Sequence, residues 1–290
     1  INQDIFSYDI KRFQKFHSEL GFIKKRITET LGDLYGMHWP FKQHKTSRNI
    51  KTLPHHENLK SFGACFGVSG GYERPMWFAL EGVKAEYKYS YNYQNWYPSA
   101  EYETNNTIKN VGLFDLTPFS KFEIKSENAH QELQKICTAN IKNEIGKCTY
   151  THMLNSDGGI ESDLTVVCVE KNNFRIISSA ATRERDKFHI KKHLSSEIEL
   201  KDITDNFCVF GLFGPKSRDL IRTISKDDFD NDKFKFGTAK YISVDGVKIW
   251  AQRLSYVGEL GYELYIEKDK AKEIYNLITN IGKKYQLSLC

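Results

Sequence analysis

Two acidic residues stand in sequence patterns that suit ligand chemistry, and the first is Glu259. It lies between two glycines in Tyr-Val-Gly-Glu-Leu-Gly-Tyr-Glu at 256–263, a run that joins two strand-like segments. Glycine lets the backbone approach a ligand or enter a positive-φ turn. Glu259 would then be free to accept two hydrogen bonds from a planar nitrogen heterocycle. The ordinary interpretation is a hairpin with an exposed glutamate, and spacing alone favours it.

The second acid, Asp115, is embedded in the apolar run Gly-Leu-Phe-Asp-Leu-Thr-Pro-Phe at 112–119. An acid desolvated by such neighbours either pairs with a donor or has a raised pKa suited to proton transfer. The ordinary interpretation is that Asp115 caps the turn that Thr117-Pro118 predicts. A further acidic run, 155–163, predicts a turn followed by a strand, and its Asp163 is expected only to pin that turn.

Other common site signatures are missing from the sequence. There is no GxGxxG dinucleotide fingerprint and no phosphate loop ending in Gly-Lys-Ser/Thr, which excludes binding of FAD or ATP in those ways. The six cysteines include no CxxC pair, so we expect reduced thiols. Four histidines of the segment before residue 60 match no ligand spacing, so we expect no metal site. These are His38, His44, His55 and His56.

Hydrophobic periodicity predicts the elements that must position the two acids. Strand-like and helical runs alternate in two similar halves, and Asp245-Gly246 marks a hairpin turn. This rhythm predicts an α+β fold of two fused ferredoxin-like β-α-β-β units, preceded by a helix and an extended connector. The predicted strands are 121–125, 164–169, 174–178, 208–213, 239–244, 247–254 and 261–266, and the predicted helices are 129–137, 183–194, 216–224 and 269–284.

The first 60 residues differ from the rest of the chain. A helical stripe runs from about residue 7 to 35 and predicts one long or broken helix, and Pro40 and Pro54 make 37–59 an extended connector. We therefore place a domain boundary near residue 60, with 1–60 as one part and 61–290 as the other. The start shows no signal peptide, and the hydrophobic run at 287–290 stops abruptly, so we expect a fragment.

Composition narrows the classes of partner. The chain of 290 residues has 42 Lys and Arg against 37 Asp and Glu, a mild net charge of +5 that is spread along the sequence. That distribution gives no focused field for nucleic acid. We find no apolar run near the roughly 18 residues that a membrane span needs. A small-molecule substrate is the expected partner, and the sequence does not give the oligomeric state.

Four motifs follow one another in the second part of the chain. They are Gly-Leu-Phe-Asp-Leu-Thr-Pro-Phe-Ser at 112–120, Tyr-Thr-His-Met-Leu-Asn-Ser-Asp-Gly-Gly-Ile at 150–160, Gly-Leu-Phe-Gly-Pro at 211–215 and Ser-Tyr-Val-Gly-Glu-Leu-Gly-Tyr-Glu at 255–263. In this order they resemble the tetrahydrofolate-binding domain of the glycine-cleavage T-protein superfamily. Before them stand Met-His-Trp-Pro at 37–40 and Gly-Gly-Tyr-Glu-Arg-Pro-Met-Trp-Phe at 70–78, which resemble the join between the flavin and folate parts of dimethylglycine and sarcosine dehydrogenases.

The resemblance implies a function. The parent flavoprotein oxidises an N-methyl group of a methylated glycine, and the folate domain captures the carbon on tetrahydrofolate to give methylenetetrahydrofolate. Asp115 matches the family acid beside the reacting folate nitrogens, with a role in proton transfer. Glu259 matches the acid that pairs with the pterin ring. Thr117, Tyr256 and Gly258 lie beside these positions and are expected to line the folate pocket.

The resemblance also implies what this chain does not carry. The family's arginine-containing segment and small C-terminal barrel would follow residue 290, and the flavin domain that holds FAD would precede residue 1. Residues 1–60 would be the tail of that flavin domain, and 61–290 a truncated aminomethyltransferase-like domain. Two alternatives remain: an aminomethyltransferase of glycine cleavage, and a folate-domain scaffold without turnover. The expected location is the cytoplasm, or the mitochondrial matrix in a eukaryote.

Overall fold

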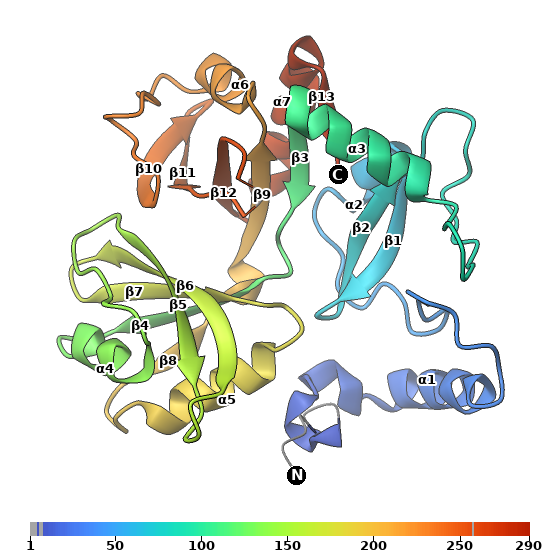
Figure 1. The fold of residues 1–290 in the computed structure, drawn as a ribbon, viewed down its shortest axis with the longest axis horizontal. Helices are drawn as coiled ribbons and strands as arrows, with labels where there is room; N and C mark the ends of the chain where they lie inside the picture. The colour runs from blue at the N-terminus through green and yellow to red at the C-terminus, as the bar shows by residue number, and fades with distance from the viewer. Residues whose placement is uncertain (1–4, 6–7, 257) are drawn as a thin grey trace.

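The computed structural model describes residues 5, 8–256 and 258–290 (Figure 1). Val257 of the Glu259 motif and the start of the predicted first helix lie outside the described residues. The sequence predicts one long or broken helix here, and the helix is broken. Two short 3-10 helices, Ile10–Arg12 and Lys15–Ser18, precede α1, Leu20–Asp33. None of the residues of α1 is buried.

The connector is less extended than the sequence predicts. Helix α2, His56–Ser61, begins within it. Pro54 does not prevent this helix, because it stands before the first helical residue, where its missing N–H costs no helical hydrogen bond. A two-stranded hairpin of β1, Ala64–Ser69, and β2, Tyr72–Phe78, then leads to α3, Tyr97–Lys109. The sequence analysis missed this hairpin and α3.

A six-stranded sheet positions both candidate acids. Asp115 ends one of its strands, and the segment that carries Glu259 joins two others. The sheet has the order β10-β11-β12-β9-β3-β13, with helices α6, Ser217–Ile224, and α7, Ala271–Gly282, between its strands in sequence. The expected turn between β10 and β11 is confirmed, since Asp245 and Gly246 have φ of 48° and 81°. The strands are β3 Val111–Asp115, β9 Phe207–Phe213, β10 Thr238–Val244, β11 Val247–Arg253, β12 Gly261–Glu267 and β13 Leu287–Leu289.

A five-stranded sheet makes the other half, in the order β5-β6-β7-β4-β8. Helices α4, Ala129–Ile136, and α5, Arg183–His193, contribute to its core through Leu133 and Ile190. The α+β fold with two β-rich halves is therefore as predicted. The strands are β4 Ser120–Lys125, β5 Cys148–Leu154, β6 Ile160–Glu170, β7 Asn173–Ser178 and β8 Leu200–Asp202.

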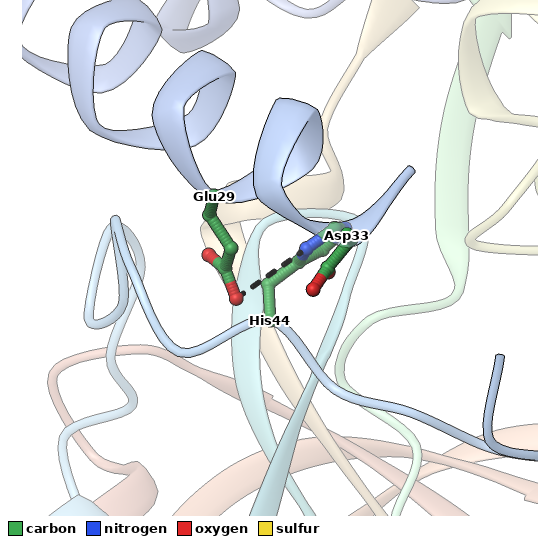
Figure 2. Close-up of side chains that lie close together, drawn as sticks. All are labelled: Glu29, Asp33 and His44. Carbon is green, nitrogen blue, oxygen red and sulfur yellow. Dashed lines mark ion pairs between the residues drawn. The ribbon is translucent and has the colours of Figure 1, made fainter. Parts of the chain in front are cut away.

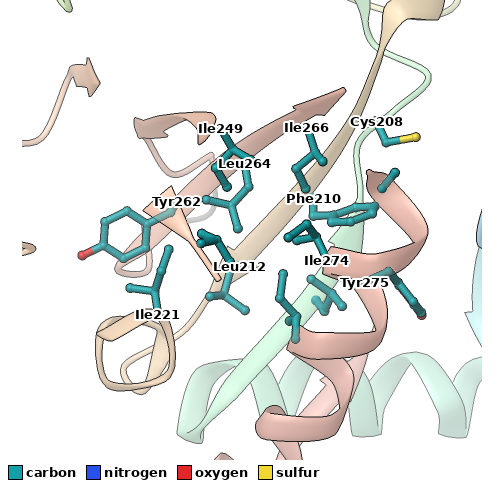
Figure 3. Close-up of a cluster of buried hydrophobic side chains, with 14 of the residues drawn as sticks. Cys208, Phe210, Leu212, Ile221, Ile249, Tyr262, Leu264, Ile266, Ile274 and Tyr275 are labelled. Carbon is teal, nitrogen blue, oxygen red and sulfur yellow. The ribbon is translucent and has the colours of Figure 1, made fainter. Parts of the chain in front are cut away.

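Two hydrophobic layers hold the six-stranded sheet in place. On one face, alternate residues such as Phe210 and Leu212 of β9 pack against Ile274 and Tyr275 of α7 (Figure 3). On the other face, Val209 and Tyr265 form a cluster with Val167 of β6. Each sheet is therefore covered on both sides.

This double cover corrects one sequence prediction. Alternation over 121–125 predicts a half-buried strand, which would place Lys121 towards water. Lys121 is instead fully buried, whereas Glu123 on the same face is half-buried and Lys125 is exposed, so other chain segments cover only the start of this face. No helix among the described residues is long and apolar enough to cross a lipid bilayer.

Candidate functional site

Asp115 is the last residue of β3, where the chain passes from the six-stranded to the five-stranded sheet. The backbone N–H of Thr117 donates to its Oδ1 at 2.9 Å, so Asp115 caps the turn, as the ordinary interpretation predicts. The Thr117 hydroxyl accepts the N–H of Val209 at 3.0 Å, which fixes the turn against β9. Turn and strand thereby hold the carboxylate in one orientation.

The Asp115 side chain is only 3% exposed, and an imidazole lies next to it. Its Oδ2 lies 3.6 Å from Nε2 of His55, which is itself fully buried. Burial raises the pKa of Asp115, but His55 and the Thr117 donors outweigh burial, and the net pKa lies below its ordinary value. Asp115 is therefore an ionised buried acid, and the alternative of a raised pKa is wrong.

Lys121 brings a second ionisable group to this turn. Its Nζ donates to the carbonyl oxygens of Thr117 at 2.9 Å and Phe119 at 2.6 Å. Burial lowers the pKa of Lys121 to about 7. The sequence analysis missed both Lys121 and His55. In the sequence, Lys121 stands in an apolar strand and His55 stands before a helix. Neither feature indicates a partner that is distant along the chain.

Glu259 lies in the segment between β11 and β12, away from regular structure. It is half-buried, and its carboxylate has no hydrogen-bond or ion-pair partner among the described residues. Gly258 beside it has φ of +85° and is exposed, which fits the expected positive-φ turn. The carboxylate of Glu259 is therefore available to a ligand.

Tyr256 ties this segment to the other half of the molecule. Although 78% exposed, it donates its hydroxyl to Oδ2 of Asp163 on β6 at 2.8 Å. Tyr150 on β5 donates to the same oxygen at 3.2 Å. The hydrogen bond to Asp163, with burial, raises the pKa of Tyr256. Asp163 thus does more than the turn-pinning role the sequence analysis expects.

The structure does not bring Asp115 and Glu259 together. Asp115 pairs with Phe210 on one flank of β9, whereas Gly261, two residues after Glu259, pairs with Phe213 on the other flank. Three residues of strand separate these register positions, about 10 Å along β9. Any one ligand that meets both acids would contact them with different parts.

Buried polar groups lie on the two strands that flank this segment. Gln252 of β11 is fully buried and stands opposite Glu263 of β12, and neither its Oε1 nor its Nε2 has a partner among the described residues. Tyr265 donates its hydroxyl to Oε2 of Glu263 at 2.9 Å, and burial raises the pKa of Glu263. An amide buried without partners is costly, so unused hydrogen-bonding capacity exists here.

One cluster has the residue types of a metal site. Glu29, Asp33 and His44 place ligand atoms within 4.8 Å of one another (Figure 2). Both carboxylates already have partners: Glu29 accepts the N–H groups of Lys45 and Thr46, which with the Thr46 hydroxyl lower its pKa to about 2 although burial raises it. Asp33 pairs with Lys42 at 2.6 Å. The cluster therefore fastens the connector to α1.

Two cavities lie away from the candidate acids. One, of about 490 Å³, is bordered by Phe16, Arg26, Gly71 and Arg185, between the first segment and the start of α5. The other, of about 560 Å³, is bordered by Arg48, His56 and Tyr87. Neither is lined by Asp115 or Glu259.

Comparison with known families shows which family the chain belongs to. The model of the GCVT N-terminal domain family matches residues 55–290, which include both acids and the strands that carry them. The chain belongs to this family. A second model, the FAD dependent oxidoreductase central domain, matches residues 2–52. The chain is thus an aminomethyltransferase-like domain that follows part of an oxidoreductase domain.

Individual relatives agree with this assignment. The chain is 33% identical over 287 residues to 4-methylaminobutanoate oxidase (formaldehyde-forming) of Paenarthrobacter nicotinovorans, covering 99% of this chain and 35% of that protein. It is 27% identical over 284 residues to the mitochondrial dimethylglycine dehydrogenase of Rattus norvegicus, covering 97% of this chain and 33% of that protein. The chain spans about a third of the length of these curated relatives.

A solved structure shows the same fold. The glycine cleavage system aminomethyltransferase T of Bartonella henselae superposes with a TM-score of 0.66 at 19% identity, covering 83% of this chain and 59% of that chain. This likeness supports the α+β architecture of this GCVT-family chain.

The residues of this chain do not themselves fit FAD. The described part of the region that matches the oxidoreductase model consists of short helices and the connector, and it includes no strand, glycine-rich turn and helix in succession. That unit is what binds a dinucleotide pyrophosphate.

Proposed function

We propose that this chain is the one-carbon transferase part of a flavin-dependent dimethylglycine or sarcosine dehydrogenase-like oxidoreductase. The observation that carries the proposal is the order of the two family matches, an oxidoreductase domain at 2–52 directly followed by a GCVT domain at 55–290. Such an order supports a coupling of folate-dependent chemistry to an amine oxidation that releases a one-carbon unit. The domain division near residue 60 stays a prediction.

The proposed reaction uses tetrahydrofolate as substrate. Two N–H groups of the folate add to the carbon of formaldehyde or of the corresponding iminium; with the iminium, its C–N bonds are lost and the amine leaves. With formaldehyde, two C–N bonds form, the C=O bond is lost and water leaves, which gives methylenetetrahydrofolate. Addition needs a base for each proton released, and an ionised carboxylate positioned at the reacting nitrogens supplies one.

Asp115 is the proposed catalytic acid-base residue. Its lowered pKa keeps it ionised near neutral pH, and the Thr117 N–H holds Oδ1 while Oδ2 has no hydrogen-bond partner among the described residues. Oδ2 is therefore the oxygen available to take a proton. Burial from water strengthens the interaction of this carboxylate with any cationic intermediate.

Glu259 is the proposed pterin anchor, because its half-buried carboxylate has no partner in the part of the chain that the structure describes. Two carboxylate oxygens suit the paired N–H donors of a flat heterocycle. Gly258 opens the turn for close approach, Tyr256 holds the segment through Asp163, and Thr117 lines the pocket on the Asp115 side. These roles stay predictions.

The test is single-turnover capture of formaldehyde on tetrahydrofolate by the 290-residue chain. We expect methylenetetrahydrofolate to form faster than without protein, and Asp115→Asn to lose roughly 100-fold of that enhancement. The Asn variant still accepts the Thr117 N–H, so the turn is kept. An unchanged rate in Asp115→Asn would contradict the catalytic role.

The aminomethyltransferase alternative uses a different donor. Release of ammonia from an aminomethylated lipoyl carrier protein, with no capture of formaldehyde, would favour it over our proposal. Folate binding with neither reaction would favour the scaffold. We propose that the protein lies in the cytoplasm, or in the mitochondrial matrix in a eukaryote; the name of the rat relative describes that protein as mitochondrial.

A further inference from the structure

His55 enters the core of the GCVT domain at the start of α2. Its ring stacks on Tyr275 of α7, with centroids 4.5 Å apart and planes at 21°, and meets the edge of Phe210 on β9 at 5.0 Å. Figure 3 shows Phe210 and Tyr275 side by side in this layer, with Cys208 at its end. The ring of His55 is fully buried. Aromatic packing on two sides therefore fixes the plane of the imidazole.

The fixed ring directs one nitrogen at the candidate catalytic acid. Nε2 of His55 lies 3.6 Å from Oδ2 of Asp115, and neither atom has a hydrogen-bond partner among the described residues. A movement of about 0.5 Å brings the two atoms within hydrogen-bond distance. A buried ionised carboxylate without such a partner would pay a large desolvation cost.

The other polar groups around Asp115 do not fill this role. Lys121 of β4 donates from its Nζ to two backbone carbonyls. The backbone N–H of Thr117 donates to the other carboxylate oxygen of Asp115, Oδ1. Cys208 of β9 is a neutral thiol, because burial raises its pKa to about 12. Tyr275 of α7 is also neutral, because burial, with Asp115 nearby, raises its pKa. His55 is the group left to complete the shell of Oδ2.

We propose that His55 is a positioning residue for Asp115, donating its Nε2–H to Oδ2 and keeping this carboxylate ionised and oriented inside an apolar pocket. The significance for catalysis rests on the proposed function, whereas the His55 and Asp115 pair itself does not. When the carboxylate takes a proton from the folate nitrogen, the proton resides on Oδ2, and the hydrogen bond then weakens. The pair thereby limits how long Asp115 stays protonated.

The direct test measures the pKa of Asp115 without folate. Carboxyl ¹³C NMR titration, with Asp115→Asn to assign the signal, compares the wild type with His55→Leu, His55→Phe and His55→Gln. We expect the Asp115 pKa to rise by about one unit or more in His55→Leu and by less in His55→Gln, which keeps a neutral N–H donor. His56→Leu and His56→Gln, changes at the adjacent histidine, should leave it unchanged.

The outcomes separate this inference from the proposed function. An unaltered Asp115 pKa in a folded His55→Leu or His55→Phe variant, both of which remove the donor, would overturn the pairing, whatever the folate results are. If the wild type captures no formaldehyde but the Asp115 pKa rises in the His55 variants, the proposed function fails and the pairing stands. If both hold, His55→Leu lowers kcat with little change in the KM for tetrahydrofolate, and His55→Gln restores part of the loss.

Discussion

Tyr256 and Asp163, which are 93 positions apart in the sequence, are joined by a hydrogen bond of 2.8 Å. The bond connects the segment that carries Glu259 to β6 of the five-stranded sheet. Because the segment has no regular structure of its own, this contact is a main restraint on where the Glu259 carboxylate lies. The two halves of the fold thus position the proposed pterin anchor together.

Tyr256→Phe should loosen that segment without unfolding the protein. The bond is exposed, so we expect a loss of about 1 kcal/mol or less in the free energy of unfolding, with faster amide hydrogen exchange in 254–260. Tyr102→Phe, a change at an exposed tyrosine of α3, is the matched control and should leave 254–260 unaffected. Equal exchange in wild type and Tyr256→Phe would contradict the restraint.

Gln252→Leu should stabilise the ligand-free protein. The amide of Gln252 is buried and has no partner among the described residues, so its replacement by an apolar side chain removes a desolvation cost of about 1 to 3 kcal/mol. Urea unfolding of the two proteins measures the difference. A variant clearly less stable than the wild type would show that the amide is already satisfied.

Glu103 makes stability depend on pH around neutrality. Burial raises its pKa to about 7, although the Phe78 N–H that it accepts acts in the opposite direction. An acid with a raised folded pKa contributes its stability below the unfolded value of 4.5, and this stability is lost as pH rises through 7. Glu103→Gln should therefore match the wild type near pH 5 and exceed it in stability at pH 8.

The neighbouring Glu101 provides the control for this pH dependence. It is exposed on the same helix, so Glu101→Gln should keep the wild-type profile of unfolding free energy against pH. If Glu103→Gln and the wild type lose stability in parallel between pH 5 and pH 8, the carboxyl of Glu103 does not cause the decline.

Gly261 leaves space for an aromatic ring. A Cβ at this position would lie 2.0 Å from Cδ1 of Phe213, on the adjacent strand β9. Gly261→Ala must displace that ring, and we expect a destabilisation of about 1 to 3 kcal/mol in urea unfolding. Gly21→Ala, on α1 with no atom within 4 Å of the new Cβ, should be neutral or stabilising. Equal stabilities would mean that Phe213 relocates at no cost.

Local pattern predicted β9 and β12 well, because they alternate or run apolar between clear turns, but it did not predict β3, which carries Asp115. The hairpin of β1 and β2 was missed because Pro75 stands inside β2, and proline within a run argues against a strand. Lys121 was misplaced because periodicity within one strand does not reveal that other chain segments cover the start of its polar face.

The site was predicted in part for a similar reason. Asp115 and Glu259 were selected from their motifs, but the separation of the two along β9 follows from the strand order of the sheet. His55 meets Asp115 across 60 positions of sequence, through the packing of α2 and α7 around β9. A contact of that kind has no local sequence signal.

Calorimetric titration of tetrahydrofolate into the 290-residue chain tests the central claim most directly. We expect saturable binding that Glu259→Ala weakens about tenfold or more, from the loss of a charge-assisted pair, and that Asp115→Asn largely keeps. Glu267→Ala, at the exposed far end of β12, should bind as the wild type does. No saturable binding by the folded chain, or equal binding by wild type and Glu259→Ala, would contradict the account.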